Sequence, residues 1–251
     1  MSDADLTLKL EIAEIPFMVR CKSEEAAKEL RGYGTEKQPL FEIEAGASDL
    51  DRIREGYAEA NGKSYIRRGR IRESQIELTA IHSLMLERLI DYDVLLLHSS
   101  ALEMDGEAYL FTASRGTGKS THTSLWRECF GDRVRMINDD KPVLREKQGV
   151  IRAYGTPWNG KHHLGANISA PVKAIACLSR SENNSTAPMA PAEAFRLLYE
   201  QVPALYSREG RVKSLVLLKR LLDKVPVYSL GCNMEKEAAL TAYKAMSRCQ
   251  E

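Results

Sequence analysis

The stretch ASRGTGKS, residues Ala113 to Ser120, is the clearest indication of the fold in this sequence. Glycines at Gly116 and Gly118 allow positive φ, so successive backbone N–H groups can turn inward and form a concave nest for phosphate oxygens. In such a loop the lysine reaches the β- and γ-phosphates of a nucleotide, and the hydroxyl after it holds Mg²⁺. We interpret the stretch as a phosphate-binding P-loop in which Ala113 replaces the usual first glycine. The alternative is a glycine turn with an incidental lysine.

The residues on either side of the loop favour this interpretation. Ala108 to Thr112 (AYLFT) is a short apolar and aromatic run typical of a strand, and Ser120 to Phe130 can continue as a helix that ends at Gly131. Strand, glycine loop and helix are the order that a P-loop requires, and the helix N-terminus adds partial positive charge to the anion site. We expect the loop and the first helical turn to bind the nucleotide through Ser114, Arg115, Gly116, Thr117, Gly118, Lys119, Ser120 and Thr121.

The next apolar run ends in two acidic residues, in the sequence RMINDDKP. One helix and one turn separate Asp139 and Asp140 from Lys119, so we expect their strand to lie beside the P-loop strand and to bring both carboxylates near the γ-phosphate. One carboxylate would bind Mg²⁺ and the other would accept the proton of an attacking hydroxyl. These groups and fixed positive charge are most of what phosphoryl transfer needs. The alternative is an Asp pair that caps a helix or a turn.

Histidines and a glycine-rich loop flank these motifs. His98 ends the apolar run LLLH and could project toward the same site, although lone histidines are often structural. The loop GTPWNGK offers Trp158 and Lys161, which either cover a ligand or are a packed tryptophan and a solvated lysine. His162 and His163 follow without a third ligand at metal spacing, so we predict no metal there.

The bulk composition excludes several classes of protein. The 251 residues include 36 basic and 35 acidic side chains, and a net charge of +1 gives no global field that attracts nucleic acid or an anionic membrane. Five cysteines without a CxxC pair argue against a zinc site or a disulfide framework. The N-terminal residues lack a signal-peptide pattern, and the apolar runs are too short to span a bilayer. We expect a soluble, cytoplasmic protein.

Hydrophobic patterns predict the remaining elements. Asp105-Gly106 lies between two apolar runs and indicates a hairpin, and Glu73 to Asp91 has the apolar stripe of an amphipathic helix. Asn183 to Pro191 is typical of a flexible loop. Other runs predict strands at Leu6–Ile12, Pro16–Cys21, Leu40–Ile43, Val134–Ile137, Val172–Leu178 and Val227–Leu230, and helices at Ala192–Leu198, Val212–Leu222 and from Glu235 onward. We predict an α/β fold with a small α+β N-terminal region, residues 1–72, and a larger P-loop domain, residues 73–251.

The succession of His98, a hairpin, the P-loop, a short helix and Asp139-Asp140 resembles the catalytic core of HPr kinase/phosphorylase and, more remotely, of phosphoenolpyruvate carboxykinase. The motifs that carry the resemblance lie between about Val94 and Leu178. It implies a mixed β-sheet kinase core of that type. The first ninety or so residues are unmatched and look like the variable N-terminal part of small HPr-kinase-like proteins that accompany bacterial peptide-modifying gene clusters.

The resemblance also implies an activity and roles for residues. It implies an ATP-dependent kinase acting on a serine hydroxyl. From the P-loop and the paired aspartates we predict a Mg·ATP-dependent kinase that phosphorylates a Ser or Thr hydroxyl of a peptide or small protein, with Asp139 as the base. Lys119 and Ser120 match the phosphate- and Mg²⁺-binding positions, and Asp139, Asp140 and His98 match the base, the metal partner and a histidine near the phosphates.

Two features depart from the family pattern, and the alternatives remain open. Thr121 stands where HPr kinases carry an acidic residue, and no arginine-bearing docking and phosphorylase region is evident. HPr kinases assemble as hexamers, so the resemblance admits a homo-oligomer. The alternatives are a small-molecule kinase or carboxykinase-like phosphoryl transferase, and a non-catalytic ATP-binding regulator.

Overall fold

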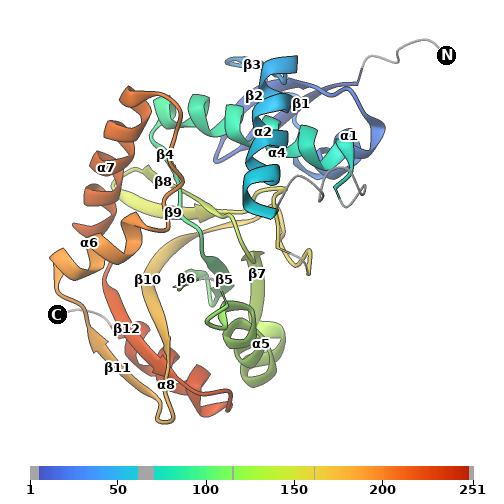
Figure 1. Ribbon diagram of the computed structural model, residues 1–251. Helices are drawn as coiled ribbons and strands as arrows, with labels where there is room; N and C mark the ends of the chain where they lie inside the picture. The colour runs from blue at the N-terminus through green and yellow to red at the C-terminus, as the bar shows by residue number, and fades with distance from the viewer. Residues whose placement is uncertain (1–5, 62–70, 115, 161, 249–251) are drawn as a thin grey trace. The chain divides into compact units, whose positions relative to one another are not determined.

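The computed structural model in Figure 1 describes residues 6–61, 71–114, 116–160 and 162–248. The chain forms two compact units, Met1–Tyr92 and Asp93–Glu251. The predicted boundary lay after residue 72, whereas the structure assigns helix α4 (Glu73–Leu89) to the N-terminal unit. The reason is that α4 packs against the helices and the sheet of that unit.

The N-terminal unit is a three-stranded sheet with helices, in agreement with the predicted α+β region. Strands β1 (Thr7–Ile12) and β2 (Ile15–Arg20) form an antiparallel hairpin, and β3 (Glu42–Glu44) joins β2 in parallel. Helix α1 (Glu24–Leu30) begins at Ser23, whose hydroxyl accepts from Ala26 N at 3.3 Å and caps the first turn. Helix α2 (Ala47–Asn61) precedes α4, and the 3₁₀ turns η1 (Arg31–Tyr33) and η2 (Ile90–Tyr92) follow α1 and α4.

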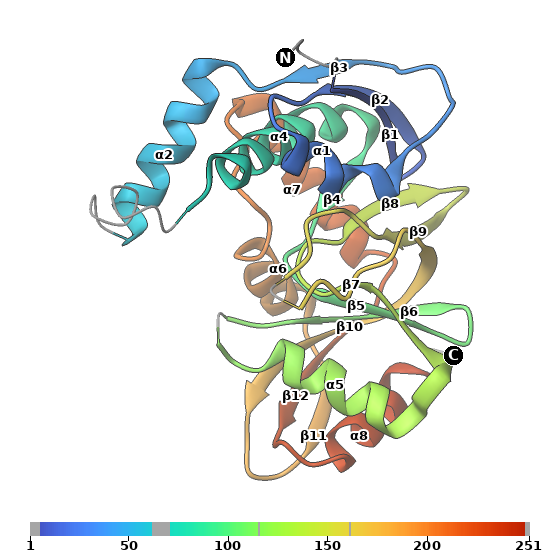
Figure 2. The ribbon, with the colours of Figure 1, turned by 90° about the vertical axis from the view of Figure 1, so that its right-hand side faces the viewer.

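The second unit is built on a curled mixed sheet, as the predicted α/β class requires (Figure 2). The strands pair in the order β4-β8-β9-β10-β6-β5-β7, with β12 pairing β10 and β11. The long strand β10 joins the two parts of the sheet, because its first residues pair with β9 and its later residues lie between β6 and β12. The bounds are β4 (Val94–Leu96), β5 (Ser100–Met104), β6 (Glu107–Thr112), β7 (Val134–Asn138), β8 (Val143–Lys147), β9 (Val150–Tyr154), β10 (Ser169–Arg180), β11 (Ser185–Pro188) and β12 (Val227–Cys232).

The Asp105-Gly106 turn decides which strands flank the P-loop strand. Both residues have positive φ, 55° and 85°, as the tightest β-hairpins require, so β5 folds back antiparallel on β6. Strand β10 occupies the other side of β6. The prediction that the aspartate-bearing strand lies beside the P-loop strand is therefore wrong, because β7 pairs with β5 and lies one strand further out.

Two helices cover one face of this sheet beneath the P-loop. Helices α5 (Lys119–Phe130) and α8 (Glu237–Met246) pack against each other and against the strands (Figure 2). Trp126 of α5 is fully buried there, with Tyr109 and Tyr243 within 6 Å of its ring. This aromatic core fixes α5 against the sheet and so fixes the position of its N-terminus.

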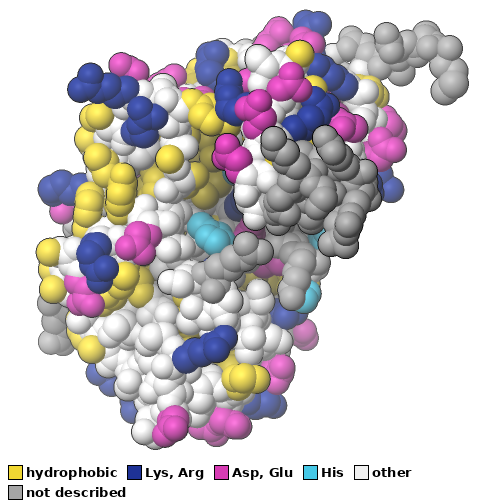
Figure 3. Space-filling model, viewed as in Figure 1, with side chains coloured by type: hydrophobic (Ala, Val, Ile, Leu, Met, Phe, Trp, Pro, Cys, Tyr) yellow, Lys and Arg dark blue, Asp and Glu magenta, His cyan; other side chains and the backbone are white. Residues whose placement is uncertain are grey.

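Two further helices, α6 (Pro191–Tyr199) and α7 (Arg208–Leu222), pack as a pair. Hydrophobic side chains gather on their outer side in Figure 3, and the exposed ones include Tyr199, Val212 and Val216. The predicted flexible loop at Asn183–Pro191 is partly wrong, since Ser185–Pro188 form β11, whose backbone pairs with the edge of β12. Within the described ranges, none of the helices is long and apolar enough to cross a membrane.

Candidate functional site

The predicted P-loop follows β6 directly and opens α5. Gly116 and Gly118 have φ of 80° and 125°, a region that L side chains rarely adopt, so glycine is strongly favoured at both positions. The loop is tightened by the N–H and hydroxyl of Thr117, which donate to Ser114 O at 3.2 and 2.8 Å. Helix α5 then starts at Lys119, with its N-terminal dipole directed at the loop. The local geometry is that of an anion-binding helix N-terminus.

Lys119 is half-buried and turned back on its own loop. Its Nζ donates to Ala113 O at 3.3 Å. Burial lowers the pKa of Lys119 from its ordinary value, and the nearby charge of Asp140 partly opposes that shift. Among the described residues, the carbonyl oxygen of Ala113 is the only hydrogen-bond partner of the Lys119 ammonium. A partly desolvated ammonium of this kind gains strongly from an anion, because charge-assisted hydrogen bonds are about twice as strong as neutral ones.

An arginine from the end of β10 supports the loop from outside. Arg180 donates to Gly116 O at 2.7 Å and to Thr117 O at 3.5 Å. These bonds fix two carbonyl oxygens of the loop. Arg180 therefore helps to fix the backbone of the loop.

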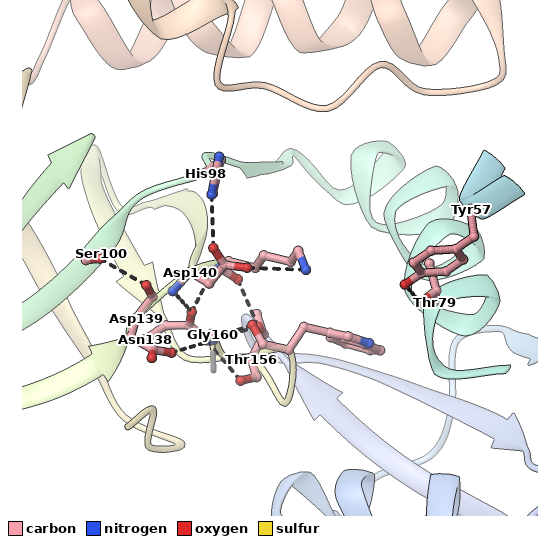
Figure 4. Close-up of polar contacts among 11 residues, drawn as sticks. Tyr57, Thr79, His98, Ser100, Asn138, Asp139, Asp140, Thr156 and Gly160 are labelled. Carbon is pink, nitrogen blue, oxygen red and sulfur yellow. Dashed lines mark hydrogen bonds and ion pairs between the residues drawn. The ribbon is translucent and has the colours of Figure 1, made fainter. Parts of the chain in front are cut away.

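Asp139 lies at the end of β7 and is only 5% exposed. Its Oδ1 accepts from Gly160 N at 2.6 Å, and its Oδ2 is buried with no hydrogen-bond partner among the described residues (Figure 4). Gly160 is needed for this approach, because a Cβ there would lie 3.0 Å from Asp139 Oδ2. A buried carboxylate oxygen without a partner costs free energy, so it indicates a proton or a ligand that the site is built to take.

The turn after β7 is held by Asn138. Its Oδ1 accepts from the N–H groups of Asp140 and Lys141 at 2.8 and 2.6 Å, and its Nδ2 donates to Thr156 O at 3.0 Å. Asn favours such turns because its side chain substitutes for a backbone group. Ser100 also donates to Asp139 O at 3.0 Å. The two aspartates do occupy a turn, as the alternative interpretation holds, and the turn presents their side chains to a cavity.

Asp140 makes polar contacts with His98 and Lys141. His98 Nε2 and Asp140 Oδ1 are 2.9 Å apart, and Lys141 Nζ lies 3.3 Å from Asp140 Oδ2 (Figure 4). Burial alone would raise the pKa of Asp140, but the bonds and charges of His98 and Lys141 outweigh it and hold that pKa at about 2. Asp140 is therefore ionised at every physiological pH. His98 lies in the connection between β4 and β5, where Thr112 Oγ1 donates to its carbonyl oxygen at 2.9 Å.

A cavity of about 1030 Å³ brings these residues together. Eight predicted site residues line it, and they include Lys119, Ser120, Asp139, Asp140 and His98. Gly116, Gly118 and Thr121 also reach its wall. The cavity continues along α5 past Thr123 to Arg127.

A second cavity of about 780 Å³ lies against the P-loop. Gly116, Gly118 and Thr121 line both cavities, so the loop forms a wall common to the two. Thr117 and His122 line this cavity as well, and its remaining lining residues lie at or just after the ends of β10 and β12 and include Arg180, Glu182 and Met234. No carboxylate of the Asp139-Asp140 pair lines this second cavity.

Several predicted residues lie elsewhere. Arg115 and Lys161 fall outside the described residues. Ser114 is exposed and serves the turn of the loop through its carbonyl oxygen, without lining either cavity. Trp158 is buried, which agrees with the packed alternative, and His162 lines the larger cavity. Across the described ranges, no group of three or more His, Cys, Asp or Glu side chains could hold a metal ion.

Sequence reasoning missed Gly160, Lys141 and Arg127. Gly160 was part of a loop recognised only as glycine-flexed, and nothing local shows that its N–H meets a carboxylate 21 residues earlier. Lys141 was adjacent to the aspartates and could have been included on that ground. Arg127 follows Ser120 by seven residues in a helix, a spacing of almost two whole turns that returns to the same face and was available from the sequence.

Comparisons with known proteins supply only a weak structural similarity. No protein-family model matches this chain, and no curated protein is significantly similar to it. Among solved structures, the Hpr(Ser) kinase/phosphatase from Coxiella burnetii is similar over 61% of this chain and 94% of that chain, with 11% sequence identity and a TM-score of 0.35. Similarity at this level carries no weight for function, so function has to come from the residues of this chain.

Proposed function

We infer that this chain is a Mg·ATP-dependent phosphotransferase that transfers the γ-phosphate to a Ser or Thr hydroxyl of a peptide or small protein. One observation carries the proposal. A helix N-terminal anion nest and a buried carboxylate with an unpartnered oxygen face the same cavity. An anion site alone indicates binding, and the addition of a free carboxylate oxygen indicates chemistry on a hydroxyl.

The arrangement of the two cavities supports a nucleotide that crosses the P-loop. Phosphates on the loop would leave the nucleoside in the smaller cavity, beside Arg180 and Glu182, and direct the terminal phosphate into the larger one. Only the larger cavity contains Asp139 and Asp140. The nucleoside side and the transfer side are therefore distinct in this proposal.

The side chains present fit a Mg²⁺ ion bound together with a nucleotide. Mg²⁺ in such sites is held by one or two protein oxygens, by phosphates and by waters, and does not need an all-protein cage. The Ser120 hydroxyl and the ionised Asp140 carboxylate line the cavity and are the two groups that would hold it. When bound, ATP supplies the phosphoryl group and Mg²⁺ neutralises charge on its oxygens.

The remaining roles follow from the contacts of each side chain. Gly160 N fixes Asp139 Oδ1, so Oδ2 is left to accept the proton of the acceptor hydroxyl. Lys119 contributes fixed positive charge for the phosphate oxygens and would release Ala113 O to do so. His98 orients Asp140 through the 2.9 Å contact and keeps it ionised.

The test is incubation of the protein with γ-labelled ATP and Mg²⁺ in the presence of pooled Ser- and Thr-containing peptides, small proteins or metabolites. Label on a Ser or Thr side chain of a polypeptide supports the proposal. Label on a metabolite favours a small-molecule kinase or a carboxykinase-like transferase. Tight ATP binding with no transfer to any acceptor and no phosphate release refutes the proposal and favours a non-catalytic regulator.

A further inference from the structure

The larger cavity extends well beyond the space that the phosphates need. One face of α5 lines it, through Ser120, Thr123, Ser124 and Arg127. Arg127 follows Ser120 by seven residues, which places it about 10 Å further along the helix axis. Leu164 and His162, from the segment after β9, also line the cavity. The cavity therefore has a phosphate end and a far end.

Arg127 is an unusual residue in this wall. Its Nε is shielded from solvent without a hydrogen-bond partner, and its guanidinium pairs with no carboxylate among the described residues. The only carboxylates that line the cavity in the described ranges are Asp139 and Asp140, at the phosphate end. A partly desolvated guanidinium without a counter-charge is costly, and its planar donors match a carboxylate. The far end is therefore built to take an anion.

We propose that the far end of the larger cavity binds the acceptor, and that Arg127 selects acceptor peptides with a carboxylate side chain close in sequence to the reactive hydroxyl. The inference rests on the proposed function, since it assigns the acceptor half of the same site. An extended peptide rises about 3.3 Å per residue, so the 10 Å offset corresponds to a Glu or Asp about three residues from the Ser or Thr. Thr123, Ser124 and His162 also line this cavity and carry hydrogen-bonding groups.

The experiment uses synthetic peptides with one central Ser in a neutral background. Each peptide carries a single Glu at one position from four residues before to four residues after the Ser, and each has a Gln-containing counterpart. Binding is measured with a non-hydrolysable ATP analogue present, and transfer is measured with γ-labelled ATP. For wild-type protein, we expect the best Glu peptide to bind about 10- to 100-fold more tightly than its Gln counterpart, the range of a charge-assisted hydrogen bond.

Variants assign that preference to a residue. Arg127→Gln should abolish the Glu preference, and Arg127→Lys should retain part of it because it keeps the charge but loses the planar donors. Arg196→Gln is the matched control, because Arg196 is exposed on α6, outside both cavities, and its loss removes the same charge. Thermal melting of each variant verifies folding.

The outcomes separate the inference from the proposed function. Arg127-dependent binding of Glu peptides without label transfer supports the acceptor site and contradicts the kinase. Equal labelling of Glu and Gln peptides supports the kinase and overturns the role of Arg127. A Glu preference that survives in Arg127→Gln, or no Glu preference at any position in the wild type, also overturns the inference.

Discussion

Replacement of Gly160 by alanine is expected to slow phosphate release from ATP without weakening nucleotide binding. Gly160 contacts the carboxylate that we propose as the base, since its N–H donates to Asp139 Oδ1 at 2.6 Å and the three described atoms nearest to an added Cβ all belong to Asp139. Its φ lies outside the region that favours glycine, so alanine is tolerated by the backbone itself. The substitution therefore displaces Asp139 specifically.

The size of the effect follows from the space around the added methyl group. A Cβ at Gly160 would lie 3.0 Å from Asp139 Oδ2 and 3.3 Å from its Cγ. Favourable separations for carbon begin at about 3.5 Å, so the carboxylate has to move by about 0.5 Å. A misplacement of about 1 Å can cost about 100-fold in rate, which scales to about tenfold for half that displacement.

The assay compares steady-state release of labelled phosphate with the Kd for a fluorescent ATP analogue. We expect turnover of Gly160→Ala to fall about tenfold while its Kd stays within about twofold of wild type. Gly56→Ala in α2 is the control, because a Cβ there meets nothing within 4 Å. Unchanged turnover in Gly160→Ala, or a large loss of nucleotide binding, would refute the reasoning about Asp139.

Two other predictions concern charge. Lys119→Met removes the half-buried ammonium of the loop, and we expect the Kd for ATP to rise about 10- to 100-fold in a fluorescence titration; Lys173→Met, which removes a lysine paired with Glu107, should leave it unchanged. Burial holds the pKa of His122 at about 4, below the ordinary 6.5, and its Nε2 accepts from Trp126 Nε1 at 3.1 Å. As the pH falls from 6.5 to 4, this imidazole is protonated in the unfolded chain but stays neutral in the folded one. The free energy of unfolding therefore falls by about 3 kcal/mol over this range. The free energy of unfolding is measured with urea at pH 7.5 and pH 5. Between these pH values, we expect it to fall by about 2 kcal/mol less in His122→Gln than in wild type, and an equal fall would contradict the assignment.

The local parts of this fold were predictable from the sequence. The strand before the P-loop, the helix after it and the Asp105-Gly106 hairpin each depend on residues close in the chain. The choice of strand neighbours was not predictable in the same way. Whether β7 pairs with β6 or β5 depends on which edge the hairpin already occupies, and β11 exists because β12 offers an edge to Ser185–Pro188. Both depend on contacts between distant segments.

The candidate site was likewise predictable only in part. Lys119, Ser120 and the two aspartates were predicted because their residue types and spacing match the chemistry of phosphates, and they do line one cavity. The contacts that distinguish the aspartates were not predicted. Asp139 is fixed by Gly160 and Asp140 by His98 and Lys141, and only the folded chain shows which oxygen remains without a partner.

The most direct test of the central claim is phosphoryl transfer by Asp139→Asn. The amide keeps the shape of the side chain and an oxygen for Gly160 N, but it cannot take the hydroxyl proton. General base catalysis contributes about 10²- to 10⁴-fold, so we expect nucleotide binding to persist while transfer of label from γ-labelled ATP to the acceptor falls at least about 100-fold. Transfer by Asp139→Asn at the wild-type rate would contradict the account.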